Sequence, residues 1–279
     1  MKNKKLSHNG LQGSVTSVMA ALLCILIGLF VGFLVLLAIN PAHAWADGFV
    51  RILKGGFHDA PYGVGKELAN AAPLIMTGLS VGFAFKTGLF NIGAAGQYTL
   101  GAYGALYCAI MLKLPWFVCL LAAAILGGLW GAIPGFFKAY FNINEVITSI
   151  MFNWIGLYLV NELVYQNGTG PMYDVRNTRT LNLGKNADLA QSVIPDFGLN
   201  KLFQTNSTTI AIFLAAVVAI LIWVVLNKTT FGYELKAVGL NKSAARYAGI
   251  NEKKNIILSM AIAGALAGFG AGLFYPSNV

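Results

Sequence analysis

The sequence is poor in charged residues, and in acidic ones most of all. Asp, Glu, Lys and Arg make up 10% of its 279 residues, against about 25% in an ordinary soluble domain. This scarcity, together with 57% hydrophobic residues, excludes an ordinary soluble domain and indicates a membrane protein. The net charge of +9 lies in segments that flank apolar runs, a pattern that orients a chain in a membrane. No nucleic-acid motif occurs, so we expect no nucleic-acid partner.

Residues that carry catalytic or metal chemistry are equally scarce. The three cysteines fall inside apolar runs without metal-ligand spacing, which predicts that they are packing residues. The three histidines also lack such spacing. The chain has no phosphate-binding loop of the form G-x-x-x-x-G-K-[ST], so it is not expected to hydrolyse ATP. No Ser/His/Asp set or pair of carboxylates falls at one membrane depth, and we therefore expect neither an enzyme nor a cofactor.

What the chain has in abundance is long apolar sequence. Seven runs are long enough to cross about 30 Å of hydrocarbon as helices, namely residues 15–39, 67–85, 92–112, 115–137, 142–164, 209–226 and 256–275. They predict an all-α polytopic membrane protein with about seven transmembrane helices in one domain, 1–279. The first run exceeds the length of a signal-peptide core, so we expect an uncleaved anchor. The lysines that precede it predict a cytoplasmic amino end.

Two long polar segments interrupt the apolar runs. By alternation, residues 165–208 form an extracellular loop, and residues 227–255 form a cytoplasmic loop with six basic and two acidic residues. Within the second loop, residues 242–249 predict a short helix that ends at a glycine. Such a helix exceeds what a connector needs, which favours a contact with a cytoplasmic partner; the alternative is a basic loop that only fixes topology. Residues 41–66 fit either a helix at the outer membrane surface or a simple loop.

Glycines and amides at membrane depth form a further pattern. In residues 87–97 they predict either a broken helix that lines a water-filled path or close packing through glycine. Other glycines at four-residue spacing indicate helix packing: Gly127, Gly131 and Gly135. Glu145 is a helix cap, a gate residue or a partner of a basic group. A buried amide at Asn153 needs a hydrogen-bond partner, which is either a neighbouring helix or a substrate.

Three phrases of the sequence resemble one family of transporters. They are G-L-F-N-I-G-A-A-G-Q at 88–97, N-E-V-I followed by M-F-N-W within 144–154, and G-L-N followed by A-A-R-Y-A-G-I within 239–250. All three resemble the permeases of ABC importers in the simple-sugar, nucleoside and branched-chain amino acid group, and they are most similar to nucleoside permeases fed by basic-membrane-lipoprotein binders. The resemblance extends from the first apolar run to Gly272. Many relatives place an acidic residue where this chain has Ala95, so no carboxylate role is carried over to that position.

The resemblance implies a permease subunit in a bacterial plasma membrane that forms a path for nucleosides and works by alternating access. The implied partners are cytoplasmic ATP-binding subunits, a second permease subunit, an extracellular substrate-binding lipoprotein and membrane lipid. The implied ATPase-coupling residues are Gly239, Asn241, Ala244, Ala245, Arg246 and Gly249, with Arg246 as the charged contact and the glycines as turn-formers. The candidate substrate-path residues are Phe90, Asn91, Gln97, Asn144 and Asn153. Aromatic and amide groups suit a neutral nucleoside.

Other functions stay open at this point. A simple sugar or a branched-chain amino acid would use the same machinery, although an amino acid brings two charges and few ionisable groups lie at membrane depth. A secondary transporter would use intramembrane acids or histidine, of which the chain offers only Glu145 and Glu162, both near helix ends. A membrane scaffold without transport is a third class. Permeases of this family continue with further crossings, so we also expect the chain to be a fragment or a short form.

Overall fold

A computed structural model describes the backbone of residues 3–277, and the chain divides into two compact units, one ending at Gly63 and the other beginning at Val64. Within the described residues, six helices are long and apolar enough to cross a membrane. Nearly all remaining secondary structure is helical as well, so the prediction of an all-α polytopic membrane protein is confirmed.

The first unit consists of a long helix and a short helical segment. Helix α1 (Asn3–Ile39) contains the apolar span Thr16–Ile39, whose large side chains are exposed except for the half-buried Leu29, Phe33, Leu36 and Leu37. A π-helical turn, η1 (Ala44–Phe49), and the short helices α2 (Val50–Lys54) and η2 (Gly55–Phe57) follow. Phe49 and Trp45 pack on Phe33 of α1, with ring centroids 4.9 and 5.7 Å from it. A helical segment within 41–66 is thereby confirmed, and its place at the membrane surface stays a prediction.

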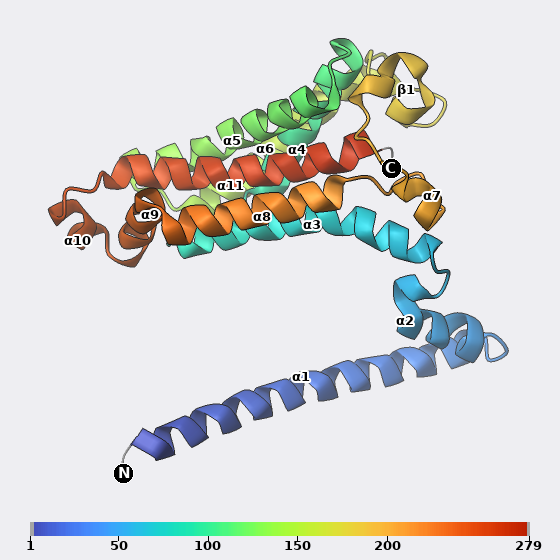
Figure 1. Ribbon diagram of the computed structural model, residues 1–279, viewed down its shortest axis with the longest axis horizontal. Coiled ribbons are helices and arrows are strands. Elements are labelled where there is room, and N and C mark those ends of the chain that lie inside the picture. The colour runs from blue at the N-terminus through green and yellow to red at the C-terminus, as the bar shows by residue number, and fades with distance from the viewer. Residues whose placement is uncertain (1–2, 278–279) are drawn as a thin grey trace. The chain divides into compact units, whose positions relative to one another are not determined.

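The second unit is a bundle of helices. It contains five of the six long helices together with the shorter α4 (Ala94–Leu106), as Figure 1 shows. The five are α3 (Tyr62–Lys86), α5 (Trp116–Phe141), α6 (Glu145–Tyr165), α8 (Ala211–Lys228) and α11 (Glu252–Phe274). The predicted crossing at 92–112 corresponds to α4 followed by the π-helical turn η3 (Tyr107–Met111). The α-helical part of this segment has only 13 residues, which is why it is absent from the six long helices.

Helices α5 and α11 pack against each other through glycine. A Cβ atom on Gly268 would lie 2.3 Å from the carbonyl oxygen of Ala123, and one on Gly127 would lie 2.5 Å from that of Gly264. Only glycine allows two helix backbones to approach this closely, which is the common device of helix packing in membranes. The four-residue spacing of these glycines therefore marks packing, as predicted, and α11 is the most buried of the long helices.

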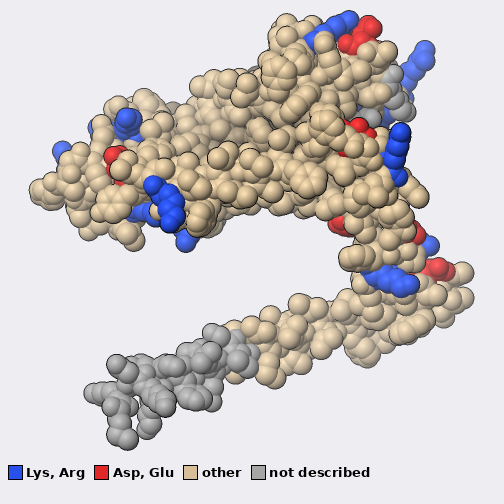
Figure 2. Space-filling model, viewed as in Figure 1, with Lys and Arg blue, Asp and Glu red and all other residues tan. Residues whose placement is uncertain are grey.

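The polar segments of this unit lie at the two ends of the bundle. At one end lie η4 (Gln166–Gly168), the paired strands β1 (Tyr173–Asp174) and β2 (Arg179–Thr180), η5 (Leu183–Lys185), η6 (Ala187–Ser192) and α7 (Leu199–Phe203). At the other end lie α9 (Thr230–Leu240) and α10 (Lys242–Tyr247). Figure 2 shows the charged side chains of this unit gathered at these two ends, with an uncharged face between them. This distribution fits a body whose middle crosses hydrocarbon.

Candidate functional site

The loop 227–255, between α8 and α11, folds into two short helices. The predicted helix at 242–249 is confirmed as α10, and its predicted end is confirmed at Gly249, whose φ of +81° suits glycine. The amino end of α10 is capped by Asn241, whose Oδ1 accepts a hydrogen bond from the backbone N–H of Ala244 at 3.0 Å. The sequence reasoning missed α9, which begins after a capping Thr229.

Helix α10 presents an exposed surface at the charged end of the bundle. Leu240 is 89% and Tyr247 is 94% exposed, and Arg246 is exposed between them in sequence. Ala245 faces the opposite way and is buried in a small apolar cluster with Val238. Leu240 is the last residue of α9, whereas Arg246 and Tyr247 belong to α10. Exposed Tyr and Arg are residue types enriched in protein interfaces, so this face of α10 is suited to bind another protein.

The end of α9 touches the turn that follows α3. A Cβ atom on Gly239 would lie 2.6 Å from the carbonyl carbon of Thr87, and one on Gly88 would lie 2.5 Å from the Cα of Gly239. Gly88 also has a φ of +72°, a conformation that other residues rarely adopt. The predicted coupling segment is therefore joined to the phrase 88–97 by direct backbone contact.

Two buried amides lock the start of α4. Asn91 Nδ2 donates to Gln97 Oε1 at 2.8 Å, and Gln97 Nε2 donates to Asn91 Oδ1 at 3.0 Å. Asn91 also donates to Ser80 of α3 at 3.2 Å, and Ser80 donates to the carbonyl of Ala263 in α11 at 2.6 Å. Both amides are fully buried, so their hydrogen bonds join three helices in the low-dielectric interior.

Asn153 of α6 also forms hydrogen bonds with the start of α4 and with the turn before it. Its Oδ1 accepts from the backbone N–H of Gly96 at 2.8 Å, and its Nδ2 donates to the carbonyl of Ile92 at 2.9 Å. The amide thus satisfies a free N–H at the start of α4. Of the two predicted partners for Asn153, the neighbouring helix is the one found. A Cβ atom on Gly96 would lie 2.9 Å from Asn153 Cα, so glycine here serves close packing.

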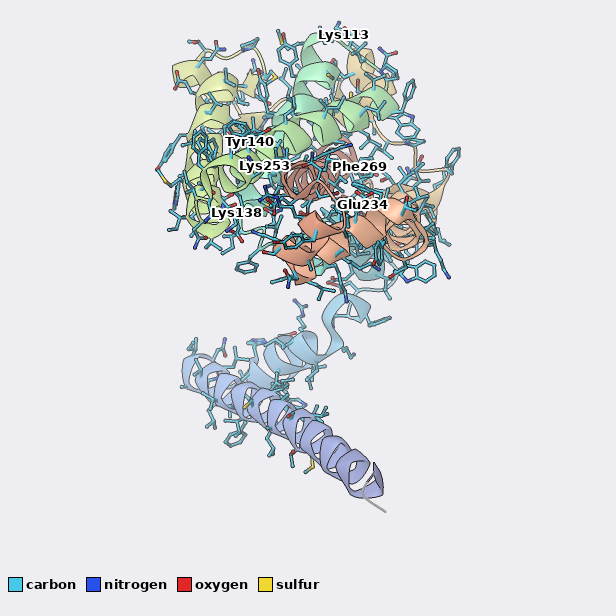
Figure 3. All side chains as sticks on the ribbon, turned by 90° about the vertical axis from the view of Figure 1, so that its left-hand side faces the viewer. Lys113, Lys138, Tyr140, Glu234, Lys253 and Phe269 are labelled. Atoms are coloured by element: carbon cyan, nitrogen blue, oxygen red, sulfur yellow. The ribbon has the colours of Figure 1, made fainter. Side chains whose placement is uncertain are left out.

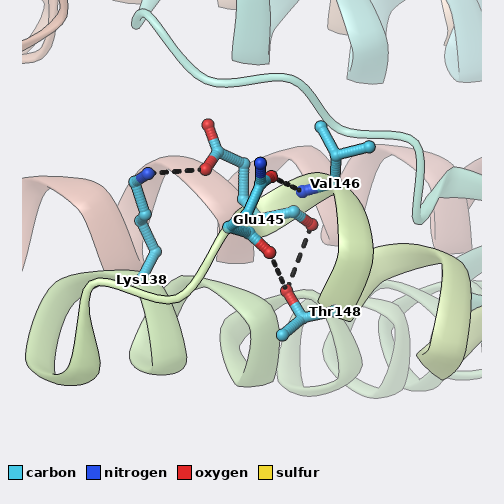
Figure 4. A network of polar contacts seen from close by, with 5 residues as sticks. Lys138, Glu145, Val146 and Thr148 are labelled. Carbon is cyan, nitrogen blue, oxygen red and sulfur yellow. Dashed lines mark hydrogen bonds and ion pairs between the residues drawn. The ribbon is translucent and has the colours of Figure 1, made fainter.

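The junction of α5 and α6 contains an ion pair and a helix cap. Lys138 Nζ lies 2.8 Å from Glu145 Oε2, and both side chains are largely buried, at 17% and 15% exposure. Asn144 caps α6 by accepting from the N–H of Val146 at 2.9 Å, and its carbonyl accepts from Thr148 (Figure 4). Of the roles predicted for Glu145, pairing with a basic group is the one observed.

A second cationic contact lies on the same end of the bundle. Lys253 of α11 places its Nζ 4.7 Å from the centre of the Tyr140 ring of α5. Figure 3 views the bundle from the end at which α9 and α10 lie, and it labels Tyr140, Lys253 and Lys138 near one another. This end of the bundle therefore carries basic side chains from α5 and α11 as well as from the loop 227–255.

The predicted path residues divide into two groups. Phe90 and Asn144 are exposed, and the Phe90 ring packs 4.8 Å from that of Phe85. Asn91, Gln97 and Asn153 use their amides in the internal hydrogen bonds described above. Their role in a substrate path stays a prediction, since each has a structural partner in this conformation.

A groove of about 670 Å³ lies elsewhere, between α3 and α4. Asn70, Pro73 and Thr77 of α3 face Ala94 and Tyr98 of α4, and Phe274 of α11 completes the lining. No charged residue lines the groove. The sequence reasoning missed Asn70 and Tyr98; the signal available was their distance of about one helical turn from Pro73 and from Ala94 of the phrase 88–97.

The fold, the glycine-packed helices and the docking face of α10 define a polytopic permease, a protein that provides a path through a membrane. The model of the family described as the permease component of branched-chain amino acid transport systems matches residues 65–279. The chain belongs to this family. It is therefore a multi-pass plasma-membrane permease subunit of an ABC importer, a transport component and not a catalyst. This membership excludes the secondary transporter and the scaffold as alternatives.

Several relatives cover most of the chain. The guanosine ABC transporter permease protein NupP of Bacillus subtilis is 34% identical over 97% of this chain and 72% of its own length. The nucleoside ABC transporter permease protein NupB of Lactococcus lactis is 32% identical over 94% of this chain and 72% of its own length. The glucose ABC transporter permease protein TsgB13 of Haloferax volcanii is 34% identical over 89% of this chain and 65% of its own length. No solved structure matches the chain.

Proposed function

We propose that this permease carries nucleosides inward and that α10 receives the movement of a cytoplasmic ATPase. The observation that carries the coupling role is the exposed face of α10 joined by backbone contact to the turn before α4. The cargo is supported by two relatives named for guanosine or nucleoside transport. It is also supported by the uncharged groove, because a neutral nucleoside needs hydrogen bonds and aromatic contacts rather than charge compensation.

Each proposed coupling residue has a distinct task. Arg246 supplies the charged contact to the ATP-binding subunit, and Asn241 fixes the start of α10 by capping it. Ala244 and Ala245 give the helix small side chains, and Ala245 packs inward. Gly239 allows the backbone contact with Gly88. The turn at the other end of the helix is provided by Gly249.

The proposed cycle uses partners on both sides of the membrane. A substrate-binding lipoprotein delivers the nucleoside to the extracellular loop 165–208, and a second permease subunit encloses the path. Closure of two ATP-binding subunits displaces the cytoplasmic loop 227–255, and the Gly239–Gly88 contact passes the displacement to the start of α4. Asn91 lies three residues and Gln97 nine residues beyond Gly88 along the chain, so the proposed path residues are close to the point at which the displacement arrives.

The test combines uptake with co-purification. In cells that lack the chain, uptake of radiolabelled nucleosides is measured after complementation with the wild type or with Arg246→Glu. We expect the wild type to restore uptake and to retain a co-purifying ATP-binding subunit, and Arg246→Glu to lose both. The matched control is Arg176→Glu, which reverses an exposed arginine in the loop 165–208 and is expected to retain the ATP-binding subunit. Retention of both properties by Arg246→Glu would refute the coupling role.

A simple sugar is the second candidate cargo, because a glucose permease is 34% identical over 89% of this chain. Competition separates the two cargoes. An excess of unlabelled nucleoside abolishes uptake of labelled nucleoside if the proposal is right, whereas restored uptake of labelled glucose that nucleosides do not compete would assign the sugar.

A further inference from the structure

Two more cavities continue the groove along α4 toward the loop 165–208. The second cavity, about 310 Å³, shares Tyr98 and Thr99 with the groove. The third, about 170 Å³, shares Leu106, Arg179 and Tyr275 with the second. Neighbouring spaces along α4, from the hairpin at one end of the bundle to the groove beside the start of α4, therefore share lining residues.

Two tyrosines line more than one of these spaces. The rings of Tyr98 and Tyr275 have centroids 6.4 Å apart and an angle of 51° between their planes. Tyr98 lines the groove and the second cavity, and Tyr275 lines the second and the third. Tyr98 is therefore the aromatic side chain that the groove and the second cavity have in common.

The amides along this route differ from those at the start of α4. Among the described residues, the side chains of Asn70 in the groove and Asn161 in the second cavity have no hydrogen-bond partner, whereas Asn91, Gln97 and Asn153 are all paired. Both residues are exposed, so their amides are open to a solute that enters the groove or the second cavity. Asn70 and Asn161 are therefore able to bind a polar solute, and each lines a space that Tyr98 also lines.

We infer that the nucleobase of a neutral nucleoside stacks on Tyr98 during passage, while Asn161 and then Asn70 bind its polar edge. The inference rests on the proposed function and adds the residues that recognise the cargo. An aromatic ring provides stacking area, and an amide provides both a donor and an acceptor, the pair that a base edge requires. The lining of the groove contains no charge, which disfavours an ionised amino acid. Its amide and hydroxyl groups disfavour a lipid acyl chain.

The kinetic test compares Tyr98→Leu and Tyr98→Phe in the assembled transporter. Loss of a base–aromatic stack raises the KM of nucleoside uptake about five- to hundredfold in Tyr98→Leu. Tyr98→Phe keeps the ring and stays within about threefold of wild type, and the maximal rate per inserted transporter changes little in either. The control is Tyr158→Leu, because Tyr158 is exposed on α6, stacks on Trp154 and lines none of the three cavities.

A protection experiment tests the occupant directly. Asn70→Cys is made in a background in which Cys24, Cys108 and Cys119 are replaced by alanine, and the cysteine is labelled in membranes with a soluble thiol reagent. We expect labelling that guanosine or another transported nucleoside slows at least about fivefold. Labelling that nucleoside does not slow, or no labelling because lipid or a second subunit fills the groove, would overturn the inference.

The outcomes separate this inference from the proposed function. If the wild type takes up no nucleoside, the proposed cargo is wrong and the inference is wrong with it. If the wild type takes up nucleoside while Tyr98→Leu has the KM of Tyr158→Leu, the importer proposal stands and the role of Tyr98 is rejected.

Discussion

Gly88 and Gly239 meet backbone to backbone, with the Cα of Gly239 only 2.5 Å from the place that a Cβ atom on Gly88 would occupy. Gly239 stands two residues before Asn241, the cap of α10, and Gly88 stands three residues before Asn91. A rigid contact at this point transmits movement, because packed backbones do not deform continuously. The proposed coupling helix and the polar start of α4 are therefore neighbours in space, although about 150 residues separate them in the chain.

We expect Gly239→Ala to impair transport. The added methyl group would lie 2.6 Å from the carbonyl carbon of Thr87, and overpacking of this kind destabilises a contact by about 1–3 kcal/mol. Uptake should fall while the amount of chain in the membrane, measured by immunoblot, stays close to wild type. Gly78→Ala is the matched control, because no atom lies within 4 Å of its added Cβ. Wild-type uptake by Gly239→Ala would show that the contact is not needed for coupling.

The amide pair at the start of α4 gives a prediction about stability. Gln97→Leu leaves both polar atoms of the fully buried Asn91 side chain without the partner they have in Gln97. An unsatisfied buried amide costs about 1–3 kcal/mol, so the midpoint of thermal unfolding in detergent should fall. The double variant Asn91→Leu/Gln97→Leu should recover part of this loss, because it removes both members of the pair. A double variant that is less stable by the sum of the single losses would contradict the pairing.

Much of the fold follows from length and hydropathy. The apolar runs predicted at 115–137 and 256–275 correspond to α5 (Trp116–Phe141) and α11 (Glu252–Phe274), since a run that cannot pair its backbone with water must be helical. Their glycine spacing predicted close packing. It did not reveal that these two helices are each other's partner, because a small-residue face does not specify what packs against it. Helix α9 was missed because its sequence is mixed and its start depends on the cap at Thr229.

The sequence predicted only those parts of the candidate site that lie within a single segment of the chain. The cap at Asn241 and the turn at Gly249 are local, so the sequence of α10 contains their signals. The bonds of Asn91 with Gln97 and of Asn153 with Gly96 depend on how separate segments pack. The groove likewise exists only once α3 and α4 lie together. The spacing of Asn70 and Tyr98 from Pro73 and Ala94 indicates a shared helix face, but it does not show that the amide is unpaired, which is recognised only when its neighbours are known.

The ion pair between Lys138 and Glu145 gives a last prediction about stability. Its side chains are only 17% and 15% exposed, and a charge-assisted hydrogen bond in such surroundings contributes about 1.5–3 kcal/mol. Lys138→Glu would place a second carboxylate beside Glu145, so we expect a clearly lower midpoint of thermal unfolding. The reversed pair, Lys138→Glu/Glu145→Lys, should recover only part of the loss, because it puts a cation at the amino end of α6, where the helix dipole favours an anion.

The control for this pair is Lys113→Glu. Lys113 pairs with Asp188 at 3.3 Å, but the side chains are 55% and 73% exposed, and exposed pairs of this kind contribute little. The unfolding midpoint of Lys113→Glu should therefore stay near wild type, and added salt should erase any small difference. If the two single reversals lower the midpoint equally, burial does not strengthen the Lys138–Glu145 pair. If the reversed pair recovers nothing, the two side chains do not interact in the membrane.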